Sequence, residues 1–272
     1  MYTGIIHTLK TIFRQEGFTA LWKGNIPAEL LYLTYGAAQF LAFRQINVLL
    51  SDASKTTAKL PDEVKSFIAG STAGAMATTA TYPFDLLRTR FAAQGAGEKV
   101  YRSIAVSIRD IYTQEGLGGF YRGLGAGLGQ IVPNMGLFFG TYSTVHNILR
   151  EPVVADLLPT PPTSGGWEDA ASGAVGSVVA KTGVFPLDLI RKRLQVQGPT
   201  KTKYVNGIYL PDYKGGVVKT GLLIMKNEGF LGLYRGLTVA LIKAVPASAV
   251  TMWTYGQVLK LLEEWDEAAG RS

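Results

Sequence analysis

The sequence has 272 residues, of which 47% are hydrophobic and only 17% are charged, whereas a soluble domain typically carries about 25% charged residues. It contains no cysteine, which excludes disulfides, thiolate catalysis and cysteine-ligated metal sites, and its two histidines are too few for a histidine-rich metal site. The net charge of +7 suits nucleic acid, anionic lipid or an anionic substrate as a partner, so the positions of the charges must decide.

Long apolar runs dominate the sequence when it is read in chain order. They occupy residues 24–50, 64–91, 124–149, 168–193 and 237–262. Each run is long enough to span a bilayer, which takes about 20 residues. Charged residues inside them include Glu29, Lys181 and Lys243. The runs predict a membrane protein with spanning helices, and a large soluble helical bundle is the alternative architecture.

One phrase occurs three times before three of these runs. It reads EGFTALWKG at 16–24, EGLGGFYRG at 115–123 and EGFLGLYRG at 228–236. An amphipathic stretch precedes each copy, at 5–15, 107–114 and 217–227. Self-similarity at a fixed period indicates a repeat architecture, here with a unit of about 100 residues.

A second phrase, Pro-x-Asp-x-x-Arg, ends two of the apolar runs. It is found in YPFDLLRTR (82–90) and in FPLDLIRKR (185–193). On a helix, the aspartate and the arginine three residues later share one face. Because a buried charge is costly unless it is paired, we expect these charges to form ion pairs. The alternative interpretation, a solvated charge at a helix end, fits Arg90 and Lys192 better than it fits Asp85 or Asp188.

The charges also separate between the two ends of the predicted helices. Segments 1–23, 85–122 and 188–235, which hold the EG phrases, are each net positive, whereas 51–63, 150–169 and 260–272 are each net negative. Concentration of Lys and Arg on one side is the pattern of a multi-pass membrane protein. The basic charge therefore follows topology, and we expect no nucleic-acid partner.

Together, the twin Pro-x-Asp-x-x-Arg phrases and the three EG phrases resemble the mitochondrial carrier family over essentially the whole chain. The resemblance implies an all-α membrane protein of the mitochondrial inner membrane, built from three pseudo-repeats around a central substrate cavity. Each repeat has two transmembrane helices and a matrix amphipathic helix. The expected repeats are 1–58, 59–160 and 161–272. The first holds only its second helix, so five of the six transmembrane helices are expected.

In that family, the phrases form a gate of ion pairs that closes the matrix side. The resemblance implies that Asp85 pairs with Arg191, whereas Arg88 and Asp188 would both pair with the absent first helix and are left without partners. A glutamine nine residues after the proline often braces the gate. Gln195 fits that position after Pro186, but Ala92 stands there after Pro83. At the cytosolic ends, FRQIN (43–47), YSTVH (142–146) and YGQVLK (255–260) lack the family's acid.

Two strings, DLLRTRFAAQG (85–95) and YGAAQFLAF (35–43), resemble the fungal branch of this family that carries thiamine pyrophosphate. An anionic pyrophosphate needs cations in a cavity, and an ionisable residue at membrane depth is a functional-site hypothesis. Lys181 and Lys243 meet that requirement, although a lysine can also extend to the membrane surface. The resemblance adds aromatic, amide and apolar cavity positions, namely Tyr35, Gln39, Phe40, Gln130, Ile131 and Asn134, each of which also suits helix packing.

The expected activity is exchange of thiamine phosphates by alternating access. The alternatives are carriage of another anionic nucleotide or cofactor, such as an adenine nucleotide or coenzyme A, or a carrier-like scaffold that does not transport. An enzyme is not expected, because no nucleophile–base pair or carboxylate pair stands out beyond the gate charges. No cofactor or metal is expected. The expected partners are a small anionic substrate and membrane lipid, including cardiolipin at the matrix-helix termini, and the chain is expected to be a monomer.

Overall fold

The computed structural model describes residues 10, 13–14, 17–18, 22, 24–56, 62–94, 103–151, 167–199, 211–213 and 215–268. Every regular element within these residues is a helix, as the apolar runs predict. The chain forms two compact units. Unit 1 contains residues up to Ile131 together with Pro186–Leu233, and unit 2 contains Val132–Phe185 together with the chain from Tyr234. The first amphipathic stretch, 5–15, lies largely outside the described residues.

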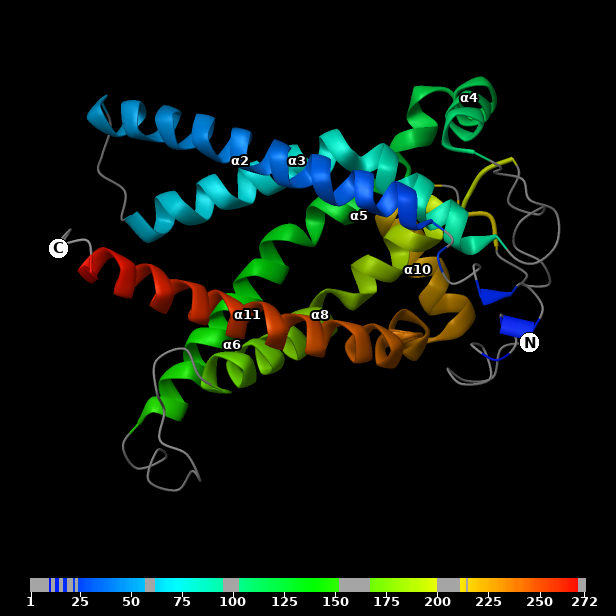
Figure 1. Ribbon diagram of the computed structural model, residues 1–272. Coiled ribbons are helices and arrows are strands. Elements are labelled where there is room, and N and C mark those ends of the chain that lie inside the picture. The colour runs from blue at the N-terminus through cyan, green and yellow to red at the C-terminus, as the bar shows by residue number, and fades with distance from the viewer. Residues whose placement is uncertain are drawn as a thin grey trace. The chain divides into compact units, whose positions relative to one another are not determined.

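Long helices stand at all the predicted runs (Figure 1). They are α2 (Asn25–Thr56), α3 (Asp62–Ala93), α6 (Ile131–Arg150), α8 (Trp167–Gln195) and α11 (Leu237–Ala268). The third predicted run is broken, because one residue, Gln130, separates the short helix α5 (Leu124–Gly129) from α6. Pro133 explains the break, since a proline has no N–H to donate and its ring clashes with the carbonyl four residues earlier. That carbonyl belongs to Gly129, the last residue of α5.

By length and composition, two stretches of the described chain are apolar enough to cross a membrane. They are Trp167–Gln195 and Phe230–Leu259. The remaining predicted runs are less apolar than their lengths suggest. Glu29 and Arg44 lie in α2, and Asn134 and His146 lie in α6. Such polar residues lower the mean hydropathy of a helix and are typical of membrane helices that face a polar interior rather than lipid.

Two shorter helices match the amphipathic stretches of the second and third repeats. They are α4 (Ile104–Glu115) and α10 (Gly216–Glu228). Helix α4 begins at an N-cap serine, Ser103, whose hydroxyl accepts a hydrogen bond from the backbone N–H of Val106 at 3.3 Å. Each helix buries a narrow stripe, which includes Ile111 in α4 and Ile224 in α10.

The EG phrases give the same backbone conformation each time. The first glycine of each copy (Gly17, Gly116, Gly229) and the last (Gly24, Gly123, Gly236) all have positive φ, between 68° and 93°. A residue with a β-carbon rarely adopts this conformation. In the second and third copies a short 3₁₀ helix lies between the two glycines, at Leu117–Tyr121 and Phe230–Tyr234. The phrase therefore encodes a helix stop, a tight turn and the start of the next helix.

Unit 1 is organised around α3. Helix α2 packs along α3 (Figure 1), and a buried apolar cluster joins α3 to α4 and to the turn after it. The cluster consists of Leu86, Leu87, Ile111 and Phe120. Leu86 and Leu87 follow Asp85 directly, so the same turn of α3 supplies both core residues and a residue of the predicted gate.

Unit 2 brings α6 and α11 against α8 through small residues of α8. A β-carbon at Gly173 would lie 2.8 Å from Cγ of Met252 in α11. At Gly176 it would lie 3.1 Å from the carbonyl oxygen of Phe138 in α6. Glycine at these two positions lets the neighbouring helices approach α8 closely, as in other membrane helix bundles.

We expect substitution of Gly123 by alanine to lower the free energy of unfolding by about 2 kcal/mol, because Gly123 has φ +86° and a β-carbon there would lie 3.0 Å from the carbonyl oxygen of Arg191. Gly129→Ala is the matched control, since nothing lies within 4 Å of its β-carbon position. Thermal unfolding of both variants in detergent measures the difference. Equal shifts for the two variants would contradict the turn's role.

Candidate functional site

Asp85 and Arg191 form the ion pair that the family resemblance implies. Nη2 of Arg191 lies 2.7 Å from Oδ2 of Asp85, and the two side chains are 17% and 18% exposed. Gln195 donates from Nε2 to the same oxygen, and its Oε1 accepts a hydrogen bond from the hydroxyl of Thr89 at 2.9 Å. The glutamine is buried, so it holds both partners on α3 from the end of α8. Gln195 thus occupies the bracing position expected for it.

The expectation that Arg88 and Asp188 lack partners is wrong. Asp188 accepts a hydrogen bond from Lys192 at 3.0 Å, one helical turn along α8. Helix geometry places residues four apart side by side, so a local partner was already encoded in the sequence. Arg88 donates to the hydroxyl of Tyr32 at 3.1 Å, and its guanidinium lies 5.4 Å from the centre of that ring. Tyr32 reaches Arg88 because α2 packs along α3.

The interpretation of Arg90 as a solvated charge is also wrong, because this side chain is completely buried. Its guanidinium binds both carboxylate oxygens of Glu115, at 2.6 Å and 3.0 Å. It also donates to the backbone carbonyl oxygens of Gln195 at 3.0 Å and Gln197 at 2.7 Å. Glu115 receives a further bond from Arg122 at 3.0 Å. One guanidinium therefore joins α3, the end of α4 and the carboxyl end of α8.

Arg193 occupies the equivalent position in the next repeat, seven residues after its proline. It forms a two-pronged ion pair with Glu228, the glutamate of the third EG phrase, with one contact at 2.7 Å. Its second partner is the hydroxyl of Tyr213, also at 2.7 Å. The sequence analysis missed both arginine–glutamate pairs. The signal was present, since the same arginine and glutamate recur at matching places in two repeats.

A polar cluster in unit 2 joins α6 to α8. The hydroxyl of Tyr142 lies 2.7 Å from Oδ1 of Asp169, and Nε2 of His146 lies 3.1 Å from the same oxygen. The rings of Tyr142 and His146 are stacked, with centroids 5.5 Å apart. The segment YSTVH does lack an acid of its own, but α8 supplies one at the start of the helix. The sequence alone could not show which helix would provide this acid.

The predicted substrate residues are divided between the two units. Unit 1 contains Tyr35, Gln39 and Phe40 on α2, together with Gln130 and Ile131 at the junction of α5 and α6. Unit 2 contains Asn134, Lys181 and Lys243, of which Lys243 is exposed and Lys181 is half-buried. Their participation in one binding site stays a prediction.

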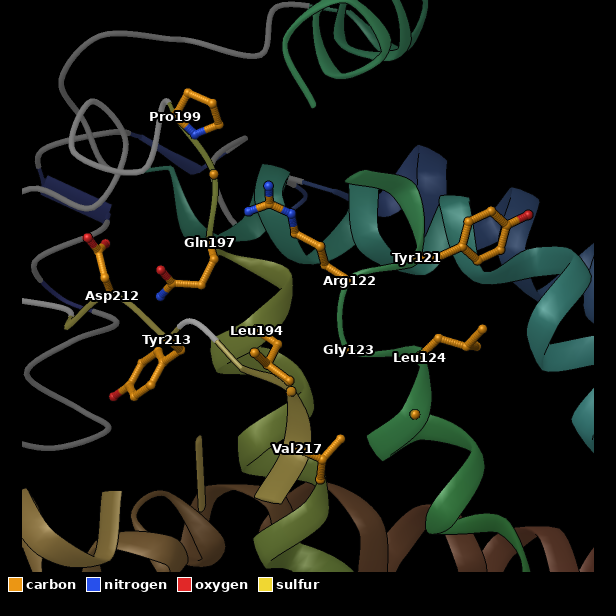
Figure 2. A pocket seen from close by; sticks show the side chains of 13 residues that line it. Tyr121, Arg122, Gly123, Leu124, Leu194, Gln197, Pro199, Asp212, Tyr213 and Val217 are labelled. Atoms are coloured by element: carbon orange, nitrogen blue, oxygen red, sulfur yellow. The ribbon is translucent and has the colours of Figure 1, made fainter. Parts of the chain in front are cut away.

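A cavity of about 620 Å³ lies in unit 1 (Figure 2), and its lining residues do not include Asp85 or Arg191. The end of the second EG phrase with the start of α5, the end of α8 and the start of α10 form its wall. Arg122 and Gly123 line one part, and Leu194, Tyr213 and Val217 line others. Helix α10 begins here at Gly215 and Gly216, and no side chain caps its first N–H groups within the described residues. The sequence analysis had no signal for this cavity beyond the helix terminus.

Comparison with known proteins identifies the class. The family model described as mitochondrial carrier protein matches residues 1–54, 61–153 and 163–265, and the chain belongs to this family. Its members are multi-pass proteins of the mitochondrial inner membrane and transporters rather than enzymes, so the expected all-α carrier fold and location are confirmed.

Relatives from fungi are similar to the chain over nearly all of its length. A protein of Emericella nidulans, named mitochondrial thiamine pyrophosphate carrier 1, is 56% identical over 272 residues, which is 100% of this chain and 81% of the relative. Proteins with the same name from Sclerotinia sclerotiorum and Coccidioides immitis are 56% and 54% identical, covering 98% and 99% of this chain and 79% and 80% of their own lengths.

We expect Arg90→Lys to lower the free energy of unfolding by about 3 kcal/mol, and more than Arg193→Lys does. Lysine keeps the charge but cannot supply the fork of donors, so buried Glu115 and two carbonyl groups would lose partners. The side chain of Arg193 is 14% exposed, which lets water replace its bonds. Thermal unfolding of the two variants in detergent is the measurement. A larger shift for Arg193→Lys would refute the assignment of Arg90 as the stronger anchor.

Proposed function

We propose that the chain exchanges thiamine pyrophosphate and related thiamine phosphates across the mitochondrial inner membrane. The observation that carries this proposal is the set of fungal relatives, named as carriers of that cofactor, which align with 98–100% of the chain at 54–56% identity. The cationic residues Lys181 and Lys243 support it, because a diphosphate that leaves water needs charged partners. We assign the chain no catalytic step.

The ion pair between Asp85 and Arg191 is proposed to close the cavity on the matrix side, braced by Gln195. A buried ion pair contributes little net stability but is costly to leave half-made. Such a contact suits a gate, because two conformations that differ by a few kcal/mol can both be populated during transport. In this arrangement Arg88 donates a hydrogen bond to Tyr32 on α2, and Asp188 pairs with Lys192 on its own helix.

The substrate site is proposed to combine the two lysines with polar and aromatic residues of the helices. Lys243 would bind the phosphates through charge-assisted hydrogen bonds, and Lys181 would lie closer to the gate, five residues before Pro186. Amides at Gln39, Gln130 and Asn134 would hydrogen-bond the aminopyrimidine ring. The remaining contacts would come from Tyr35, Phe40 and Ile131. The three repeats, 1–58, 59–160 and 161–272, are the proposed units of this arrangement.

Membrane lipid is the second proposed partner. The N–H groups at the start of α10 have no side-chain cap among the described residues and attract an anion, and the cavity lining also holds Arg122, which binds Glu115, and Asp212. Leu194, Leu124 and Val217 offer apolar surface for acyl chains. A phospholipid with phosphate groups and several chains, such as cardiolipin, matches this combination. We propose that the chain works as a monomer with lipid bound at this place.

Exchange by the purified chain in liposomes tests the proposed function. We expect uptake of thiamine pyrophosphate in preference to ADP and coenzyme A, and Lys243→Gln should lower it about tenfold or more, because a desolvated phosphate loses a charged partner. Lys226→Gln, on the exposed side of α10, is the matched control. Preference for ADP or coenzyme A would reassign the substrate, and no exchange at all would favour the scaffold. Unchanged uptake by Lys243→Gln would remove that residue from the site.

The lipid proposal has its own test. Cardiolipin should raise the unfolding temperature of the detergent-solubilised chain more than a zwitterionic phospholipid does, because phosphate would cap α10. Val217→Asp should abolish the difference, since it places a negative charge in the cavity wall. Val218→Asp is the control, because Val218 is 74% exposed and does not line the cavity. Equal responses of the two variants to cardiolipin would disprove the site.

A further inference from the structure

Tyr82, the residue before Pro83, is completely buried at a junction of three segments of unit 1. It belongs to α3, and its hydroxyl donates a hydrogen bond to the carbonyl oxygen of Arg122 at 2.9 Å. Its ring stacks on that of Tyr121, with centroids 6.3 Å apart and an interplanar angle of 13°. The guanidinium carbon of Arg191 lies over the same ring, 5.2 Å from its centre. Tyr82 thus links its own helix, α3, to α8 and to the turn that precedes α5.

The surroundings of Arg191 show why this contact matters. The guanidinium reaches Asp85 with Nη2, but its Nε is buried and has no hydrogen-bond partner within the described residues. A β-carbon at Gly127 would lie 3.4 Å from both Nε and Cζ of Arg191, and equally close to the ring of Tyr82. Little room is left for water on these sides. The face of the Tyr82 ring therefore supplies electrostatic attraction in place of part of the lost hydration.

The third repeat provides an internal comparison. Phe185 stands before Pro186 as Tyr82 stands before Pro83, and it stacks on Tyr234 with centroids 6.3 Å apart at 14°. The aromatic stack is thus common to both repeats and is a packing feature. The hydroxyl is present only in the second repeat of the two compared, because phenylalanine has none. In the second repeat, the tyrosine adds a fixed anchor to the turn and a surface for the cation.

We propose that Tyr82 is a positioning residue of the matrix gate, which holds the guanidinium of Arg191 in place for Asp85. The inference rests on the proposed gate. The bond to the Arg122 carbonyl fixes the ring, and the fixed ring offers its face to Arg191. When the gate opens, Arg191 leaves both Asp85 and the ring for water. Tyr82 therefore contributes to the closed state selectively and sets how strongly it is favoured.

A thiol-labelling assay can read gate closure directly, because the chain has no natural cysteine. Thr81 is 3% exposed and lies one helical turn before Asp85 on α3. In a Thr81→Cys background, a membrane-impermeant thiol reagent is added on the side of the liposome membrane that the matrix end of the chain faces. It reaches the new cysteine only when the gate is open. The labelling rate therefore reports how often the gate opens, and it is readable even in variants that no longer transport.

We expect Tyr82→Met to raise the labelling rate about three- to tenfold, because methionine fills the space but offers no ring face. Asp85→Asn should also raise it, and the double variant should be labelled no faster than Asp85→Asn alone, since Arg191 would already be released. Tyr82→Phe keeps the ring face but loses the hydroxyl bond that fixes it, so it should raise the labelling rate less than Tyr82→Met does. Phe185→Met is the matched packing control and should leave the labelling rate nearly unchanged.

The outcomes distinguish the proposed gate from the proposed role of Tyr82. If Asp85→Asn does not change labelling, the proposed gate fails and the role of Tyr82 fails with it. If Asp85→Asn raises labelling and Tyr82→Met raises it by a similar factor in both backgrounds, the gate stands and Tyr82 is only a packing residue. A change in Tyr82→Phe as large as that in Tyr82→Met would also overturn the inference, because the ring face would then be irrelevant.

Discussion

Arg90 is the residue on which the arrangement of unit 1 depends most. A guanidinium is planar and always charged, so burying it is tolerable only when nearly all of its donors are satisfied. Here two bonds go to the carboxylate of Glu115 and two go to carbonyl groups at the end of α8. The carbonyl of Gln195 is one that the end of α8 leaves without an internal partner, and that of Gln197 lies two residues beyond the helix. Satisfying them with Arg90 fixes where α8 ends relative to α3.

This fixed geometry positions the pair that we propose as a gate. Gln195 gives its backbone carbonyl to Arg90 and its side chain to Asp85, so the anchor and the gate share one residue. The anchor is fully buried, whereas Asp85 and Arg191 retain some exposure. Water can reach the gate pair and compensate its charges when they separate, but it cannot reach Arg90. The Arg90 contacts and the Asp85–Arg191 pair are therefore both ionic, and they differ in how far water can reach them.

Sequence reasoning located the helices and the repeats because they follow from spacing within and between copies of a motif, and it located the Asp85–Arg191 pair because the resemblance to the mitochondrial carrier family implies it. It failed where partners come from distant segments without a motif. No motif marks the contact of His146 with the acid in α8, or the contact between Tyr82 and Arg191. Arg90 was misjudged for another reason, since its place at the end of a helix suggested solvent. Its partners Glu115, Gln195 and Gln197 lie 25 to 107 residues away in sequence, so their approach is visible only in three dimensions.

The order in which the contacts of Arg90 arise during synthesis follows from their sequence separation. Glu115 lies 25 residues after Arg90, whereas Gln195 and Gln197 lie 105 and 107 residues after it. The arginine can therefore pair with Glu115 as soon as α4 has emerged from the ribosome, and it reaches α8 only after much of unit 2 has been made. The early pair keeps a buried cation neutralised throughout that interval. A newly made chain without Glu115 would carry an unpaired arginine until the end of α8 is in place.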